Sequence, residues 1–290
     1  MDTDALIEWV LERSVNFASE GEAPPLLVRA IHHAVFPGGA RVRPRLCVAV
    51  AAACGEPECL PIAAAAGAAI ELMHCASLVH DDLPAFDAAE LRRGNPSVHA
   101  AFGEPIAILA GDALIVMAFE TLLREVASAP ATCMRLSRVL AETTGSPRGI
   151  VAGQAWESEA IINLSAYHQA KTAALFVAAT MSGAASAGMD PARWRALGIR
   201  LGEAYQIADD LRDVLLGEEA LGKPSGQDAA HSRPSAVEAF GLEGAFKIFS
   251  HAVEAAAAAV PDCNGAPFLK QIVAAQAARL VPKSLMQRVA

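Results

Sequence analysis

Apolar residues recur at the spacing of an α-helix along nearly the whole 290-residue chain, and this periodicity constrains the fold more than any other feature. The chain is 53% hydrophobic but only 5% aromatic, with alanine-rich runs at 62–70 and 255–260, which favours helix over sheet. No alternating pattern of useful strand length competes with the helical one. We therefore predict an all-α protein with helices at residues 3–19, 24–34, 41–54, 60–83, 105–127, 131–143, 148–157, 165–188, 191–216, 234–259 and 265–280.

No low-complexity linker or fixed repeat divides the chain, so we expect a single domain covering residues 1–290. Two clusters of aspartates, one beginning at Asp81 and the other at Asp209, each lie at the polar end of a long apolar helix. Antiparallel helices around a cavity would bring the two clusters face to face.

The mean hydropathy of +0.32 raises the question of a membrane span. A spanning helix needs an uninterrupted apolar run of about 18 residues or more, whereas the longest runs, 46–55 and 60–70, end at Glu56 and Glu71. The first residues, Met1-Asp2-Thr3-Asp4, are acidic and lack the basic-then-apolar order of a signal peptide. We expect no transmembrane segment and a cytoplasmic location.

The net charge and the cysteines exclude further classes of protein. A formal charge of −9 argues against a nucleic-acid partner, whose phosphates would be repelled. The six cysteines form no C-x-x-C pair, so we expect reduced packing residues rather than disulfides or zinc ligands.

The three aspartates of the second cluster share one face of a predicted helix, because Asp210 and Asp213 are three positions apart and Asp209 and Asp213 four apart. Three anions so close repel one another, and hard oxygen ligands at this density suit Mg²⁺. Acidic groups at helix ends are usually solvated, however, so this cluster alone would be a weak signal.

The first cluster has a different geometry. Asp81 and Asp82 are adjacent, Pro84 disturbs the backbone, and the chain leaving its helix there can fold Asp87 back beside Asp81. Mg²⁺ held by a few carboxylates completes its shell with water and phosphate, while Arg and Lys bind the remaining phosphate oxygens. The sequence therefore predicts a diphosphate site, with four basic residues near the clusters: Arg92, Arg93, Lys171 and Lys223.

These residues resemble the trans-isoprenyl diphosphate synthases, over the chain from Phe36 to about Ser235. The matching motifs, in the order of that family, are Glu71-Leu72-Met73-His74, His80-Asp81-Asp82-Leu83-Pro84, Leu91-Arg92-Arg93-Gly94, Gly153-Gln154, Lys171-Thr172, Tyr205-Gln206-Ile207-Ala208-Asp209-Asp210 and Gly222-Lys223. Individual stretches are most similar to the short-chain bacterial branch that makes geranylgeranyl diphosphate for carotenoids and photosynthetic pigments. The resemblance implies an isoprenoid-synthase-type helical bundle around a deep central apolar cavity, and a homodimer formed through long apolar helices.

The resemblance also implies a magnesium-dependent prenyltransferase and a role for each matching position. Three Mg²⁺ ions would be held by Asp81, Asp82, Asp87, Asp209, Asp210 and Asp213. An allylic diphosphate (dimethylallyl, geranyl or farnesyl) would be bound by Arg92, Lys171, Lys223 and Arg233, and isopentenyl diphosphate by Arg43, His74 and Arg93. Thr172 and Gln206 would lie near the reacting carbons and stabilise positive charge. The expected catalytic residues are Asp81, Asp82, Asp87, Lys171, Thr172, Gln206 and Asp209.

The helix before Asp81 should line the tail cavity. Ser77, Ala76 and Met73 lie four, five and eight positions upstream, and at about 1.5 Å per residue this is one to two turns deeper than the metals. The small residues Ala76 and Ser77 predict a product longer than fifteen carbons, because farnesyl-producing relatives commonly carry a bulky aromatic residue at this level. Met73 or Leu72 is a candidate floor that would stop growth at twenty carbons.

The chain departs from the family pattern at several positions. Ala40 stands where most members have a lysine that binds isopentenyl diphosphate, and Arg41 and Arg45 are candidates to supply the missing charge. Glu157 replaces a common aspartate. A farnesyl diphosphate synthase and a non-catalytic regulatory subunit therefore remain alternatives. A di-iron protein would need Glu-x-x-His pairs that the chain lacks, and a terpene cyclase needs no isopentenyl site.

Overall fold

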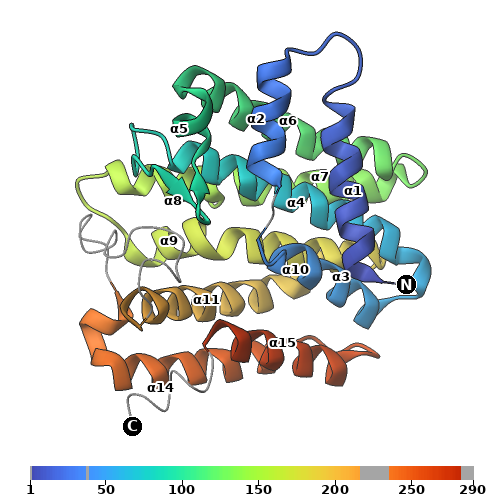
Figure 1. Ribbon diagram of the computed structural model, residues 1–290. Helices are drawn as coiled ribbons and strands as arrows, with labels where there is room; N and C mark the ends of the chain where they lie inside the picture. Colours follow the sequence, from blue (N-terminus) through green and yellow to red (C-terminus); the bar gives the residue numbers. More distant parts are fainter. Residues whose placement is uncertain (1, 37–38, 216–234, 282–290) are drawn as a thin grey trace.

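The computed structural model describes residues 2–36, 39–215 and 235–281, and helices dominate these ranges (Figure 1). The α-helices, in chain order, are α1 Thr3–Phe17, α2 Pro25–Val35, α3 Val42–Cys54, α4 Leu60–Asp81, α5 Val98–Phe102, α6 Glu104–Glu125, α7 Pro130–Thr144, α8 Ile150–Ala155, α9 Leu164–His168, α10 Ala174–Ser186, α11 Arg195–Leu215, α14 Ala236–Ala258 and α15 Ala266–Leu280. Short 3₁₀ turns occur at Pro57–Cys59, Trp156–Ser158 and Pro191–Trp194. The all-α prediction is confirmed.

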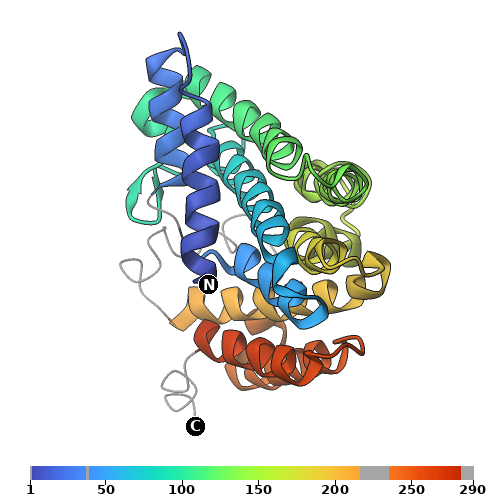
Figure 2. The same cartoon turned by 90° about the vertical axis from the view of Figure 1, so that its right-hand side faces the viewer.

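The helices form layers around α4. It packs against α6 on one side and against α3 and α10 on the other, while α14 and α15 cover the outer side of α11 (Figures 1 and 2). Its many alanines allow this close approach, and Gly67 lies against the backbone of Pro44 in α3. One apolar cluster runs from Ile7 to Val273. This continuous core is what a single domain requires, although the domain boundaries remain a prediction.

The structure adds a small hairpin that helical periodicity could not predict. Strand β1 (Leu91–Arg92) pairs antiparallel with β2 (Asn95–Pro96). The two residues between them, Arg93 and Gly94, have φ angles of 53° and 78°, as a tight hairpin turn requires. Strands of two residues are too short to show an alternating pattern, so they left no signal in the sequence.

The predicted helix at 165–188 contains an unexpected break in its hydrogen-bonding pattern. Between α9 and α10 the chain forms a π-helical segment, η3 (Gln169–Ala173). A side chain at Gly153 of α8 would overlap the backbone of Lys171, and one at Gly202 of α11 would overlap Ala173. The segment is therefore held in backbone contact from two sides. Such π-helical turns occur frequently at functional sites.

Two described helices are long and apolar enough to cross a membrane by length and composition. Residues 57–81 have a window of mean hydropathy 1.7 that is 78% buried, as in the core helix of a globular protein. Glu104–Glu125 (α6) has a window of mean hydropathy 2.0 that is only 44% buried. The second helix thus leaves an apolar face without a partner among the described residues.

Candidate active site

A cavity of about 700 Å³ opens among α4, α6, α8, η3 and α11. Carboxylates and cations lie at one end, and apolar side chains from α4, α6 and α8 line the interior. Twelve of the residues predicted from the sequence line it: Arg43, Met73, His74, Ala76, Ser77, Asp81, Asp87, Arg92, Lys171, Thr172, Gln206 and Asp209. Asp82, Arg93, Asp210 and Asp213 do not, and Lys223 and Arg233 lie outside the described residues.

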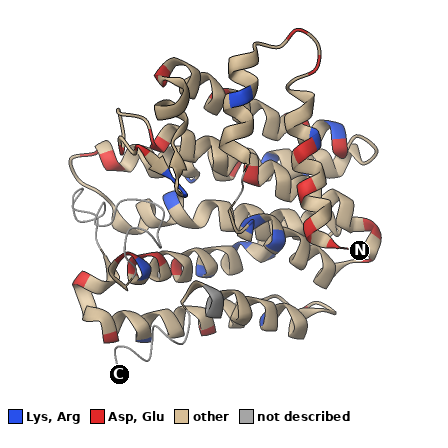
Figure 3. Cartoon of the chain, viewed as in Figure 1, with Lys and Arg blue, Asp and Glu red and all other residues tan. Residues whose placement is uncertain are grey.

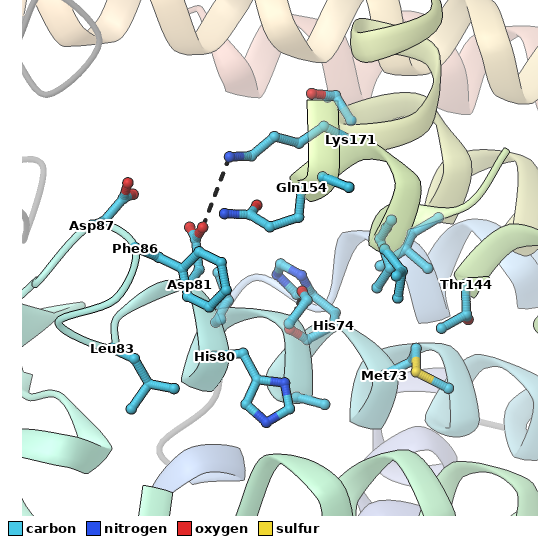
Figure 4. A pocket seen from close by; sticks show the side chains of 18 of the residues that line it. Met73, His74, His80, Asp81, Leu83, Phe86, Asp87, Thr144, Gln154 and Lys171 are labelled. Carbon is cyan, nitrogen blue, oxygen red and sulfur yellow. Dashed lines mark hydrogen bonds and ion pairs between the residues drawn. The ribbon is translucent and has the colours of Figure 1, made fainter. Parts of the chain in front are cut away.

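The first cluster folds as predicted. Asp81 ends α4, and the backbone N–H of Asp87 donates to the carbonyl of Asp81 at 3.0 Å. A turn between them, closed by the N–H of Phe86 on the carbonyl of Leu83 at 2.9 Å, reverses the chain. Both carboxylates therefore face the same cavity (Figure 4).

Asp82 does not line this cavity and is buried. The Arg92 guanidinium, returned toward α4 by the hairpin, donates to both of its oxygens, with Nε at 3.0 and 3.2 Å. Burial raises the pKa of Asp82, although the Arg92 hydrogen bond and charge oppose that rise. The structure thus pairs two predicted site residues with each other, and Arg92 still reaches the cavity wall.

The second cluster lies near the C-terminal end of α11, where acidic residues gather (Figure 3). Asp209 faces the cavity and accepts a hydrogen bond from Arg212. Asp210 is buried and accepts from the side-chain amide of Gln206 at 2.9 Å and from the backbone N–H of Ala236 at 2.7 Å. This last bond ties the second cluster to the start of α14.

Lys171, in the π-helical segment, lies beside the first cluster. Its ammonium lies 3.8 Å from an Asp81 oxygen, the contact drawn in Figure 4, and it also donates to Glu157. The Tyr167 hydroxyl donates to the same Glu157 oxygen at 2.7 Å. The next residue, Thr172, donates to the Gln206 amide oxygen at 2.6 Å. The π-helical segment thus presents Lys171 and Thr172 to α4 and α11 respectively.

The predicted isopentenyl residues form a basic group beside the cavity. The Arg43 guanidinium stacks on the rings of Phe176, at 5.0 Å, and Tyr205, at 5.8 Å. Burial, followed by the charges of Arg43 and Arg93, holds the pKa of His74 well below its usual value. His74 is therefore neutral at neutral pH and can act as a hydrogen-bond donor rather than as a charge.

Arg41 and Arg45 do not supply the charge missing at Ala40. Arg41 is 5% exposed and hydrogen-bonds Glu8 at 2.8 Å and Glu71 at 3.0 Å. Burial alone would lower its pKa, but these two carboxylates raise it. Arg45 forms a two-pronged pair with Asp4, both distances being 2.8 Å. Both arginines are committed elsewhere, and neither lines the cavity.

The far end of the cavity is apolar. Ala76 and Ser77 line its middle, and Met73 lies beyond them beside Thr144 of α7 (Figure 4). The Ser77 hydroxyl donates back to the carbonyl of His74 at 2.8 Å, so it is not directed at a ligand. The walls there also include Ile115 of α6. Space therefore continues past the two small residues, as the sequence predicted.

Several residues that line the cavity were assigned no role from the sequence. His80 faces α6, 3.4 Å from the Ile108 carbonyl and 3.7 Å from an Asp112 carboxylate oxygen, in room left by Gly111. Gln154, Tyr167 and His168 line the same cavity. Gln154 stood in a recognised motif, but His168 and Asp112 carry no local pattern that separates them from ordinary surface residues.

Comparisons with known proteins agree on one family. The sequence model described as "Polyprenyl synthetase" matches residues 24–263. The chain is 52% identical over 283 residues to a geranylgeranyl diphosphate synthase of Cereibacter sphaeroides, covering 98% of both chains, and 51% identical over 273 residues to one of Rhodobacter capsulatus, covering 94% of both. Its fold matches a Helicobacter pylori geranyltransferase complexed with magnesium and isoprenyl diphosphate, with a TM-score of 0.78, 27% identity, and 95% of this chain and 97% of that chain covered.

Proposed function

Because the chain belongs to the polyprenyl synthetase family, we propose that it is a trans-prenyltransferase that extends allylic diphosphates with isopentenyl diphosphate to give geranylgeranyl diphosphate. One observation carries this proposal. Asp81, Asp87, Asp209 and Lys171 meet at one end of a cavity whose other end is apolar. Such a cavity suits a molecule with a diphosphate head and a hydrocarbon tail.

The residues at the polar end fit Mg²⁺. Three carboxylates line one cavity from α4, the following turn and α11, and such oxygen donors are the ligands that Mg²⁺ prefers. Across the described ranges, no three His, Cys, Asp or Glu side chains are close enough to bind one ion together. This separation suits an ion that completes its shell with water and diphosphate oxygens. When bound, Mg²⁺ would neutralise charge on the departing diphosphate. Asp82, Asp210 and Asp213 remain proposed ligands, as does a total of three ions.

The chain's own residues would then promote ionisation of the allylic C–O bond. Lys171 and Arg92 bring positive charge to the place where the leaving diphosphate gains negative charge. Thr172 and Gln206, already hydrogen-bonded to each other, place oxygen dipoles near the carbocation. The apolar walls exclude water that would capture it.

The basic group beside the cavity would hold the second substrate. Arg43, His74 and Arg93 would bind the diphosphate of isopentenyl diphosphate, whose double bond attacks the carbocation. Arg93 lies against Gly39, where a side chain would overlap its guanidinium. Since Arg41 and Arg45 are occupied, we propose that the Ala40 position leaves this site with one cation fewer. Loss of a proton to the departed pyrophosphate would complete each extension.

The tail cavity supports a twenty-carbon product. Met73 is eight residues before Asp81 on a continuous helix, which places it about 12 Å deeper along the axis. Incubation with farnesyl and isopentenyl diphosphates and MgCl₂, followed by chromatography, tests the proposal. Absence of a twenty-carbon product, with fifteen-carbon product still formed from dimethylallyl diphosphate in a parallel incubation, would favour a farnesyl diphosphate synthase. Absence of product from both starters would favour the regulatory subunit.

We further propose a homodimer through the exposed face of α6. Leu109, Val116 and Leu123 are seven residues apart, so they lie along one stripe of the helix, and each is more than half exposed. Met134 of α7 is 74% exposed. Large apolar side chains gathered this way commonly mark an interface. A cytoplasmic location, expected from the first residues of the sequence, and a role in carotenoid synthesis, implied by the family resemblance, remain proposals.

A further inference from the structure

We propose that Glu157 is a positioning residue that holds the Lys171 ammonium beside Asp81, and that Tyr167 fixes the Glu157 carboxylate in turn. The inference rests on the proposed function, because it assigns a role within the same diphosphate site. Glu157 is also one of the positions where this chain departs from the family pattern, in which an aspartate is common.

Three contacts carry the inference. Tyr167 and Lys171 both donate to one oxygen of Glu157, and Lys171 lies 3.8 Å from Asp81 on its other side. The side chains of Glu157, Lys171 and Asp81 are 21%, 23% and 18% exposed. Water therefore screens these charges only in part, and the Lys171–Glu157 bond is charge-assisted.

The backbone around Lys171 makes this contact specific. Glu157 follows Gly153 by four residues, through α8 and the 3₁₀ turn after it. Gly153 touches the backbone of Lys171 itself, and no larger residue fits there. The two segments are thus in direct backbone contact, and the Glu157 side chain extends from α8 and its following turn to the Lys171 ammonium. A lysine side chain is long and adopts many rotamers, so a fixed carboxylate bonded to its ammonium restricts the positions that the positive charge can occupy.

If Glu157 acted through its negative charge alone, removing that charge would have the opposite effect on diphosphate binding. Glu157 is an anion near an anionic substrate, so a merely repulsive carboxylate would weaken diphosphate binding, and Glu157→Gln would improve it. A positioning carboxylate orients the cation that contacts the leaving group, so Glu157→Gln would impair both binding and turnover. The sign of the effect therefore separates the two roles.

The first test compares steady-state kinetics of Glu157→Gln and Glu157→Asp. We expect Glu157→Gln to lower kcat/KM for farnesyl diphosphate about tenfold, because a hydrogen bond between charged groups is lost. The KM for isopentenyl diphosphate should stay within about twofold, since its site is formed by other residues. Glu157→Asp keeps the carboxylate and should recover most of the loss. As a matched control, Glu142→Gln removes a carboxylate bonded to Arg195 at 2.6 Å, away from the cavity, and should leave these values unchanged.

The second test asks whether Glu157 acts through Lys171. In a Lys171→Ala background, Glu157→Gln should change kcat/KM by less than about twofold. An equal loss in both backgrounds, wild-type kinetics for Glu157→Gln, or improved kinetics would each overturn the proposal.

A binding measurement separates this inference from the proposed function. Calorimetry with inorganic pyrophosphate and MgCl₂ should show weaker binding to Glu157→Gln than to the wild-type chain. If the wild-type chain binds pyrophosphate but makes no prenyl product, the proposed function fails. The role of Glu157 is then still tested by the difference in pyrophosphate binding between the wild-type chain and Glu157→Gln. If product forms and both chains bind pyrophosphate equally, the inference fails and the function stands.

Discussion

The buried pair between Arg41 and Glu71 should be one of the most sensitive points of the fold. Arg41 is 5% exposed and Glu71 2% exposed, with 3.0 Å between guanidinium and carboxylate. At an effective dielectric constant of about 20, this distance corresponds to an attraction of about 5 kcal/mol. Arg41→Met removes the cation but leaves the Glu71 carboxylate buried. Losses of this kind are typically about 3 to 5 kcal/mol in the free energy of unfolding.

Urea unfolding, with the midpoint and slope fitted separately, measures this loss. The exposed pair of Lys247 and Glu243, whose side chains are 70% and 78% exposed, provides the control. Lys247→Met should leave the urea midpoint unchanged, because an ion pair between exposed side chains contributes little to stability. The double variant Arg41→Met/Glu71→Leu should recover most of the loss, because the buried carboxylate is gone and the other partner of Arg41, Glu8, is 40% exposed and stays hydrated. A loss below about 1 kcal/mol for Arg41→Met alone would refute the reasoning.

Three further predictions concern the cavity, pH and assembly. Ala76→Phe places a ring across the cavity about 7 Å from Asp81 along α4, so chromatography should show fifteen-carbon product; unchanged length would mean that residue 76 does not limit the tail. Because burial and nearby arginines lower the pKa of His74, the unfolded chain binds a proton that the folded chain does not, and stability should fall as pH drops below about 6.5. His74→Gln should flatten that fall by up to about 1.4 kcal/mol per pH unit in urea titrations, and an unchanged slope would argue against it. Val116→Asp on the α6 stripe should shift the mass measured by light scattering from dimer to monomer, and a monomeric wild type would remove the basis for this interface.

The first aspartate cluster could be predicted because its residues are close in sequence. Asp81, Asp82 and Asp87 form a local pattern, and the turn that returns Asp87 to Asp81 follows from a helix ending before Pro84. The pairing of Asp82 with Arg92 could not be predicted, because it depends on a hairpin whose strands are two residues long.

Contacts between distant elements set the other limit on prediction. The sequence made Arg41 a candidate to replace the lysine missing at Ala40. In the structure Arg41 is buried and pairs instead with Glu71 on α4 and Glu8 on α1. Likewise, the π-helical segment at Lys171 depends on contact with Gly153 and Gly202. Helical periodicity predicts that a helix forms there, but not how it is distorted by two neighbours.

The most direct test of the account is the product formed from farnesyl and isopentenyl diphosphates with MgCl₂, compared between the wild-type chain and Asp81→Asn. The wild-type chain should give geranylgeranyl diphosphate as its main product, and Asp81→Asn should reduce the rate at least about a hundredfold, because it removes a carboxylate from the proposed magnesium site. A wild-type chain that forms no twenty-carbon product, or an Asp81→Asn variant as active as wild type, would contradict the central claim.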